Sequence, residues 1–270
     1  MIETSSADGA DGHDGRDGEG AWFAQRGHGV RFDWGLAGAR RLAPEAACLV
    51  VVDVLSFTTS VTVAVDAGTR VFPYPWRDGT EAAYAARVDA ELAVGRRAVS
   101  ADRPWSLSPA ALRKAPATPR LVLPSPNGST IAAAAADGGA AVVAGCLRNA
   151  RAVGDRLAAQ GYGTPERPVV VIAAGEHWPD GSLRPALEDL LGAGAVVAAL
   201  RAAGAGPASP EAEATRLAHA PTPDVAGAVT ACASGLELSD DGFGADVAVA
   251  TELDATGAVP ILKDGAFTGL

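Results

Sequence analysis

Asp53 is the residue around which this sequence can most readily do chemistry. It ends the apolar run of residues 48–52 and is followed by Ser56, Thr58 and Thr59, after which an apolar helical pattern continues to Ala67. A buried strand that delivers a carboxylate into a hydroxyl-rich turn, just before a helix, is typical of an α/β active site. The alternative is that Asp53 caps the turn and Ser56 caps the helix. The local pattern supports both interpretations equally.

Glu188 and Asp189 are the second notable acids. They lie on an otherwise apolar helical segment, residues 184–203, with small residues at 192–195 that permit close packing against a sheet. One or both acids can join Asp53 as oxygen ligands of Mg²⁺, which prefers carboxylates. The alternative is that they face solvent on the surface of the helix.

Three further turns follow predicted strands: residues 125–130, residues 145–149 and the residues from Gly175 onward. Ligands of an open parallel sheet bind outside the carboxyl ends of the strands, and free N–H groups at a helix start favour an anion. The candidate anion-binding residues are Asn127, Gly128, Ser129, Thr130 and Asn149, together with Ser56, Thr58 and Thr59. A plain Asn-Gly turn and an ordinary cap at position 149 remain the alternatives.

Several familiar phosphatase motifs are absent. An aspartate nucleophile of the haloacid dehalogenase type requires a second Asp two residues after the first, where this sequence has Leu55. A cysteine phosphatase loop requires five residues between Cys and Arg, but Cys146 and Arg151 enclose four. Cys146 is therefore interpreted as a small buried residue. Neither a phosphate-binding Gly-rich loop nor a Gly-x-Ser-x-Gly turn occurs.

Short apolar strands alternate with helices along most of the chain. This order predicts a three-layer α/β/α sandwich with a largely parallel sheet, although a mixed sheet is left open. Strands are predicted at 30–34, 48–54, 70–74, 121–123, 140–144, 169–173, 246–250 and 259–262. Helices are predicted at 79–94, 129–136, 149–160, 184–203, 210–219 and 224–233, in addition to the one that ends near Ala67.

Composition limits the class of protein. The 270 residues carry a net charge of −10, and residues 1–20 hold six acids and one arginine. Residues 1–25 are predicted to be a disordered acidic tail, and residues 26–270 a single domain. The lack of a basic patch argues against a nucleic-acid partner, and the lack of a long apolar run argues against a membrane span. With no secretory signal, the expected location is the cytoplasm.

The ordered set of motifs resembles the 2-phosphosulfolactate phosphatases, Mg²⁺-dependent enzymes of coenzyme M biosynthesis. Residues 53–59, Asp-Val-Leu-Ser-Phe-Thr-Thr, are similar to the family's Asp-Val-Leu-Arg-Ala-Ser/Thr-Thr-Thr. Four further segments are similar to motifs of the family. Residues 126–130 resemble its Asn-Gly turn, and residues 145–152 resemble its Leu-Asn-Ala segment. Residues 174–195 resemble its Ala-Gly…Glu-Asp…Ala-Gly-Ala segment, and residues 246–260 resemble its terminal Asp-Val…Val-Pro.

The resemblance implies hydrolysis of a small anionic phosphate monoester, 2-phosphosulfolactate, to sulfolactate and phosphate. Asp53 and Glu188 are the implied catalytic residues, and Asp53, Glu188 and Asp189 the implied Mg²⁺ ligands. The small phosphoester is the implied partner, and a homodimer is left open.

The sequence also departs from the family pattern. Ser56 replaces an arginine, which removes a fixed positive charge. Only Ser108-Pro109 remains of the family's Gly-Asn-Ser-Pro, and residues 101–103, Ala-Asp-Arg, are interpreted as a shifted remnant of its Gly-Glu-Arg. The chain is therefore read as a divergent member. A non-catalytic protein that binds a small anion on the same scaffold is the main alternative, and an interaction protein that works through its acidic tail is a weaker one.

Overall fold

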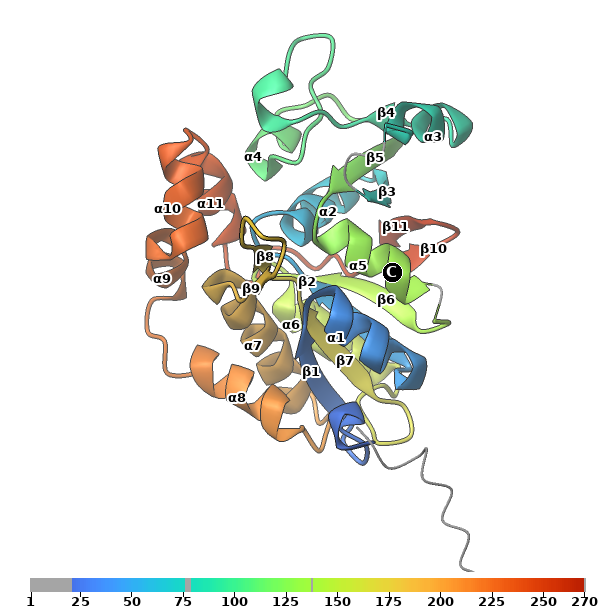
Figure 1. The fold of residues 1–270 in the computed structure, drawn as a ribbon, viewed down its shortest axis with the longest axis vertical. Helices are drawn as coiled ribbons and strands as arrows, with labels where there is room; N and C mark the ends of the chain where they lie inside the picture. Colours follow the sequence, from blue (N-terminus) through green and yellow to red (C-terminus); the bar gives the residue numbers. More distant parts are fainter. Residues whose placement is uncertain (1–20, 76–78, 137, 270) are drawn as a thin grey trace, which may run out of the picture.

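A computed structural model describes residues 21–75, 79–136 and 138–269. Most of the acidic tail predicted at 1–25 lies outside these residues, and Ala21–Ala24 form a short 3₁₀ helix. The fold is a layered α/β structure, in which helices cover both faces of one large sheet (Figure 1). The predicted three-layer α/β/α sandwich is confirmed.

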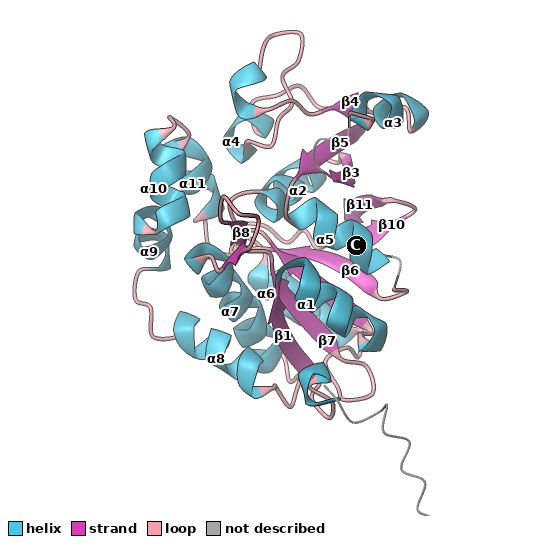
Figure 2. Cartoon of the chain, viewed as in Figure 1, coloured by secondary structure: helices cyan, strands magenta, loops and turns pink. Residues whose placement is uncertain are grey.

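The main sheet joins two sets of parallel strands through an antiparallel hairpin (Figure 2). Within the described residues its strands run in the order β1-β7-β2-β6-β10-β11-β3-β5-β4. The pairs in the β1-β7-β2-β6 set and the β3-β5-β4 set are parallel, while β10 and β11 pair antiparallel with each other and with their outer neighbours. The strands are β1 (Val30–Trp34), β2 (Cys48–Val52), β3 (Arg70–Pro75), β4 (Glu91–Leu92), β5 (Arg120–Ser125), β6 (Ala141–Gly145), β7 (Val169–Ala173), β10 (Pro260–Lys263) and β11 (Ala266–Gly269).

Strand β2 shows why the sheet is covered on both faces. All five of its side chains are buried, and they alternate between two apolar cores. Cys48, Val50 and Val52 pack into the core beneath the helices that follow β6 and β7, whereas Leu49 and Val51 pack into the opposite core. A strand buried on both faces reads as a continuous apolar run, which is why this strand was predicted, although it ends at Val52 rather than at residue 54.

Three helices, α1, α2 and α5, cover one face of the sheet, and α6 and α7 cover the other (Figure 1). Helices α9, α10 and α11 lie together beside the sheet, and the short hairpin of β8 (Glu176–His177) and β9 (Leu183–Arg184) lies between β7 and α7. The helices are α1 (Gly35–Leu42), α2 (Phe57–Asp66), α3 (Glu81–Arg87), α4 (Pro109–Leu112), α5 (Gly128–Ala136), α6 (Ala150–Ala159), α7 (Leu187–Ala202), α8 (Pro210–His219), α9 (Val225–Ala231), α10 (Ala233–Asp240) and α11 (Gly244–Ala250).

Two predicted elements are wrong. Residues 246–250 form helix α11 rather than a strand, because a short apolar run has no periodicity that separates the two. Its buried residues Asp246, Val247 and Ala250 have the spacing of one helix face. The helix predicted at 79–94 ends at Arg87, after which the chain forms the edge strand β4.

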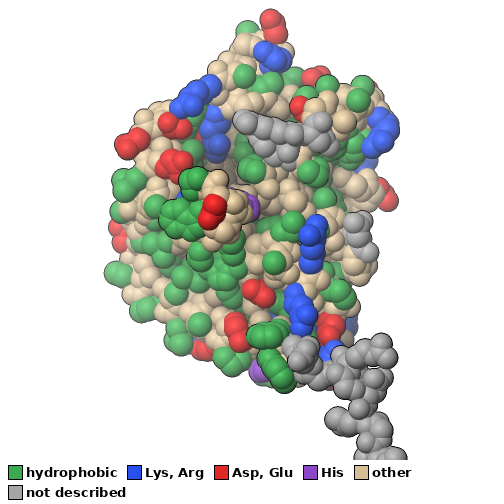
Figure 3. Space-filling model, in the orientation of Figure 1, with side chains coloured by type: hydrophobic (Ala, Val, Ile, Leu, Met, Phe, Trp, Pro, Cys, Tyr) green, Lys and Arg blue, Asp and Glu red, His purple; other side chains and the backbone are tan. Residues whose placement is uncertain are grey.

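The described surface carries mixed charge. On the face drawn in Figure 3, basic and acidic side chains are interspersed, with no extended field of either sign. None of the helices in the described residues has the length and apolar character needed to cross a bilayer.

Candidate active site at the carboxyl end of strand β2

The loop after β2 holds Asp53 in a fixed position. The backbone N–H of Phe57 donates to Asp53 Oδ1 at 3.0 Å, and that of Gly128 donates to Oδ2 at 2.9 Å. Thr58 closes the loop, because its Oγ1 accepts from the Asp53 N–H and donates to the Asp53 carbonyl. Thr59 Oγ1 donates to the carbonyl of Val54. Asp53 is therefore anchored from both α2 and α5.

Asp189 joins the ends of two neighbouring strands. Its Oδ1 accepts from the N–H of Val54 after β2 at 2.7 Å, and its Oδ2 accepts from the N–H of Gly175 after β7 at 2.8 Å. The side chain is buried. Both oxygens of this carboxylate are thus used to brace the loops that carry Asp53 and Glu176.

Four acids gather at this edge of the sheet and disfavour one another's charge. Burial is the main cause that raises the pKa of Asp53, and the nearby Glu188 adds to it. Burial followed by the charge of Asp53 raises the pKa of Glu176 to about 7. Burial, Asp53 and Glu188 together raise the pKa of Asp189 well above its ordinary value. Such a cluster is unfavourable unless a proton or a cation neutralises it.

A cavity of about 350 Å³ opens beside Asp53, and we call it the carboxylate cavity. Its walls come from the loops after β2, β5 and β7, from the segment that follows β4, and from α10. The lining residues are Asp53, Leu55, Ser56, Arg96, Leu107, Ser125, Pro126, Asn127, Glu176, Ser234, Glu237, Leu238 and Asp241.

A second cavity of about 340 Å³ shares Pro126 and Asn127 with the first, but its lining is mainly apolar. The convergence of charged groups makes the carboxylate cavity the candidate active site.

Asn127 gives the cavity an unusual oxygen. Its Nδ2 donates to Glu176 Oε2 at 2.9 Å, which directs the amide oxygen away from that carboxylate. Asn127 Oδ1 is buried and has no hydrogen-bond partner. A buried acceptor without a partner is costly, and a cation would satisfy it.

The mixed set of oxygens in this cavity is suited to Mg²⁺, even though it is not a cluster of acidic side chains alone. Among the described residues, no three His, Cys, Asp or Glu side chains are arranged to hold a metal ion. Mg²⁺, however, keeps several of its waters and is commonly held by one or two carboxylates. Asp53, Glu176 and Asn127 supply two carboxylates and one amide oxygen in the same cavity.

Of the three predicted metal ligands, Glu188 and Asp189 lie behind the cavity rather than in its lining. Asp189 bonds to the two loop amides, and Glu188 Oε2 accepts from the thiol of Cys232 at 3.2 Å. Both residues lie in the first turn of α7, where the charge of Glu188 adds to burial in raising the pKa of Asp53, and the charges of Asp53 and Glu188 add to burial in raising the pKa of Asp189. This arrangement does not favour a metal ion bound by Asp53, Glu188 and Asp189 together.

Arg96 brings a positive charge to the predicted position of a negative substrate. Its Nη2 donates to Ser56 Oγ at 2.6 Å, and its Nε donates to Asp246 Oδ2 at 2.8 Å. Asp246 is almost fully buried and also accepts from Ser108 Oγ and from the N–H of Ala110. Ser56 thus lies in the cavity as predicted, and a guanidinium from elsewhere in the chain reaches it. Residues 101–103, interpreted from sequence as the remnant of an arginine motif, are exposed on a loop.

Other predicted anion-binding residues have structural partners instead. Thr58 and Thr59 lock the β2 loop, and Ser129 Oγ bonds to the carbonyls of Ser125 and Tyr74. Asn149 accepts from the N–H of Cys146 and donates to two carbonyls, so all its side-chain hydrogen-bonding atoms are used. None of these four lines the carboxylate cavity.

Thr130 bonds to the carbonyl of Pro126 and lines the second cavity. Gly128 takes part through its N–H to Asp53.

Two residues of the site were not predicted. Glu176 follows the buried strand β7 across Ala174 and Gly175, which is the same arrangement that singled out Asp53. Arg96 carried no comparable signal, because the chain has twenty arginines and their abundance gave each one little weight.

The fold and the cavity define an α/β protein with a carboxylate-lined site where strands of a mixed sheet end. The family model of 2-phosphosulpholactate phosphatase matches residues 39–265. The chain therefore belongs to this family of phosphatases. No curated protein matches the sequence.

Proposed function

We propose that the protein hydrolyses 2-phosphosulfolactate to sulfolactate and inorganic phosphate in a reaction that depends on Mg²⁺. Water supplies the oxygen that replaces the ester oxygen on phosphorus, and the leaving oxygen becomes the hydroxyl of sulfolactate. Membership of the family supports the reaction, and the cavity beside Asp53 supports its location. We further propose that the reaction takes place in the cytoplasm and serves coenzyme M biosynthesis.

Asp53, Glu176 and Asn127 would hold the metal ion. When bound, Mg²⁺ would neutralise the carboxylates and polarise the phosphoryl group. Phe57 and Gly128 hold the carboxylate of Asp53 in place through their N–H groups, and Asn127 holds Glu176. These contacts fix the oxygens before a ligand arrives, so little reorganisation is needed on binding.

One observation carries the proposal. Asp53 and Glu176, two carboxylates with raised pKa values, line a cavity together with Asn127, whose buried amide oxygen has no partner. Leaving such charges and such an oxygen without a partner is costly. A cation bound in this cavity would satisfy both, which supports the proposal.

Release of inorganic phosphate from 2-phosphosulfolactate tests the proposal, measured with and without Mg²⁺. We expect turnover that EDTA abolishes and that Asp53→Asn lowers at least about 100-fold, because the metal ion loses a charged ligand. Glu213→Gln is the matched control, since this acid bonds only to Arg216 on the outer surface of α8. Its turnover should equal that of the wild-type protein.

The alternative is a non-catalytic protein that binds a small anion in the same cavity. Titration calorimetry with sulfolactate separates the two functions. Binding of sulfolactate without phosphate release at any Mg²⁺ concentration would support the alternative and overturn the enzymatic proposal. Phosphate release that persists in Asp53→Asn would move the reaction away from this cavity.

A further inference from the structure

Arg96 has a position in the cavity that its structural contacts do not explain. Among the described residues that line the carboxylate cavity, it is the one with a positive charge, whereas Asp53, Glu176, Glu237 and Asp241 are acidic. An arginine needed only to hold α11 in place could bond to Asp246 without facing the cavity. Its side chain instead lines the cavity and is 18% exposed in total.

The contacts of Arg96 fix the guanidinium and leave one edge of it free. Nε is held by Asp246 and Nη2 by Ser56, while no described residue accepts a hydrogen bond from Nη1. The planar guanidinium can therefore present further N–H donors in a fixed direction. Asp246, which Ser108 and Ala110 also hold, prevents the side chain from turning away.

Ser56 extends this donor group. Its Oγ accepts from Arg96, and no described residue accepts its proton. A hydroxyl that accepts one hydrogen bond still has its own hydrogen to donate. Ser56 and Arg96 together offer donors from two chemical groups, side by side, to one anion.

Two groups of residues in the lining of the cavity differ in what they can bind. Asp53, Glu176 and Asn127 attract a cation, and through it the phosphoryl group of the proposed substrate. Ser56 and the free Nη1 of Arg96 offer hydrogen-bond donors to an anion, and charge-assisted hydrogen bonds are among the strongest in proteins. A substrate with two anionic groups can use both groups of residues.

We propose that Arg96, with Ser56, binds the sulfonate of the substrate and so selects sulfonated phosphoesters. This inference rests on the proposed function and adds the group that determines specificity. The sulfonate lies one carbon beyond the carbon that carries the phosphoryl ester, so it can bond to Arg96 and Ser56 while the phosphoryl group lies beside Asp53 and Glu176.

The test compares two substrates that differ in a single group, 2-phosphosulfolactate and 2-phospholactate, which lacks the sulfonate. We expect Arg96→Gln to lower the ratio of their kcat/KM values by about 10- to 100-fold, chiefly through the KM of the sulfonated ester. Arg96→Lys should restore only part of the ratio, because an ammonium lacks the planar fork. Arg151→Gln is the matched control, since Arg151 is exposed and pairs with Asp254, and neither residue lines the carboxylate cavity. Its ratio should remain that of the wild-type protein.

An equal loss with both esters would overturn the inference, because Arg96 would then act on the phosphoryl group, on the carboxylate that both esters carry, or on the fold. Titration of sulfolactate and of lactate into the protein provides a readout without catalysis. Preferential binding of sulfolactate that disappears in Arg96→Gln supports the inference, even if the wild-type protein releases no phosphate. If sulfolactate and lactate bind the wild-type protein equally, Arg96 does not recognise a sulfonate.

Discussion

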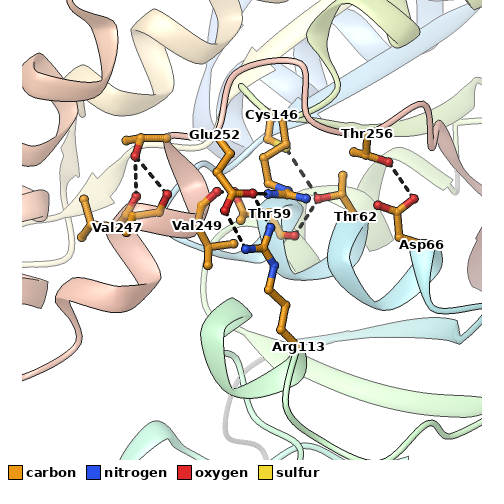
Figure 4. A network of polar contacts seen from close by, with 12 residues as sticks. Thr59, Thr62, Asp66, Arg113, Cys146, Val247, Val249, Glu252 and Thr256 are labelled. Carbon is orange, nitrogen blue, oxygen red and sulfur yellow. Dashed lines mark hydrogen bonds and ion pairs between the residues drawn. The ribbon is translucent and has the colours of Figure 1, made fainter.

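Two groups of acids in this molecule have opposite electrostatic surroundings. Burial raises the pKa of Asp53 and Glu176, which line the carboxylate cavity, and of Asp189 behind it. After α11, Glu252 instead pairs with the guanidinium groups of Arg113 and Arg148. Figure 4 shows Glu252 beside Arg113. Hydrogen bonding to Arg113 is the main cause that lowers the pKa of Glu252 to about 2.

The difference separates a structural cluster from one that needs a ligand. Glu252 has its counter-charges within the protein, and it neutralises Arg148, whose side chain is almost fully buried. Asp53 and Glu176 have no ion-pair partner among the described residues, and burial makes their charges costly. We infer that the chain tolerates this cost because the acids perform the chemistry, whereas Glu252 stabilises the fold.

The same substitution should strongly lower activity in the cavity group and leave it almost unchanged in the Glu252 group. Glu176→Gln removes a charge from the proposed metal site, and we expect it to lower Mg²⁺-dependent phosphate release about 100-fold. Glu252→Gln should leave the turnover of the folded protein within about 3-fold of the wild-type value, since Glu252 does not line the cavity. Steady-state phosphate release at saturating Mg²⁺ measures both. Similar losses of phosphate release in the two variants would contradict the inference that the cavity acids act in the reaction and Glu252 does not.

The effects on stability should be in the reverse order, with the larger loss in Glu252→Gln. Glu252→Gln leaves the buried guanidinium of Arg148 without its carboxylate, and we expect a loss of about 1–2 kcal/mol, reduced from a fully buried pair because Glu252 is partly exposed. The folded pKa is lowered, so this stabilisation is present above the ordinary pKa near 4.5 and is lost as the pH falls toward 2. Urea unfolding of both proteins at pH 7 and at pH 3 measures the effect. A difference that is as large at pH 3 as at pH 7 would contradict the assignment to the ion pairs.

The sequence could predict where acids follow strands but not what their oxygens bond to. Asp53 was identified because a buried apolar run leads directly into a polar turn, and the strand bounds 30–34 and 169–173 and the start of β2 at Cys48 follow from the same pattern. The side chains of Asn149 and Thr58 bond to backbone groups. Such side chains can bond either to the backbone or to a ligand, so the residue type alone does not separate the two roles. Arg96 reaches Ser56 from 40 residues away, and such a contact depends on tertiary packing rather than on local pattern.

The pH dependence of the stability of Glu176→Gln tests directly how much the buried charge of a cavity acid destabilises the fold. The folded pKa of Glu176, about 7, lies above its ordinary value, so wild-type stability declines as the pH rises from about 4.5 to 7. The glutamine keeps an oxygen for the hydrogen bond from Asn127 and carries no charge. We expect the variant to match the wild-type protein at pH 4 and to exceed it by about 1 kcal/mol at pH 8, after allowance for partial exposure. Unfolding in urea at both pH values, without divalent ions, is the measurement. A variant that is less stable at pH 8 would mean that the charge of Glu176 supports the fold.

In the wild-type protein, Mg²⁺ should offset the loss of stability that the buried charge of Glu176 causes. A cation that binds only the folded state at about five times its Kd stabilises by about 1 kcal/mol, which corresponds to about 2–4 °C in Tm for a chain of this size. We expect this rise at pH 8 in the wild-type protein and in Glu252→Gln, and a much smaller rise in Glu176→Gln. Thermal unfolding in EDTA and in Mg²⁺, at constant ionic strength, separates site binding from general screening. An equal rise in all three proteins would show that Mg²⁺ acts on the surface charge of the chain, and the carboxylate cavity would then have no special affinity for it.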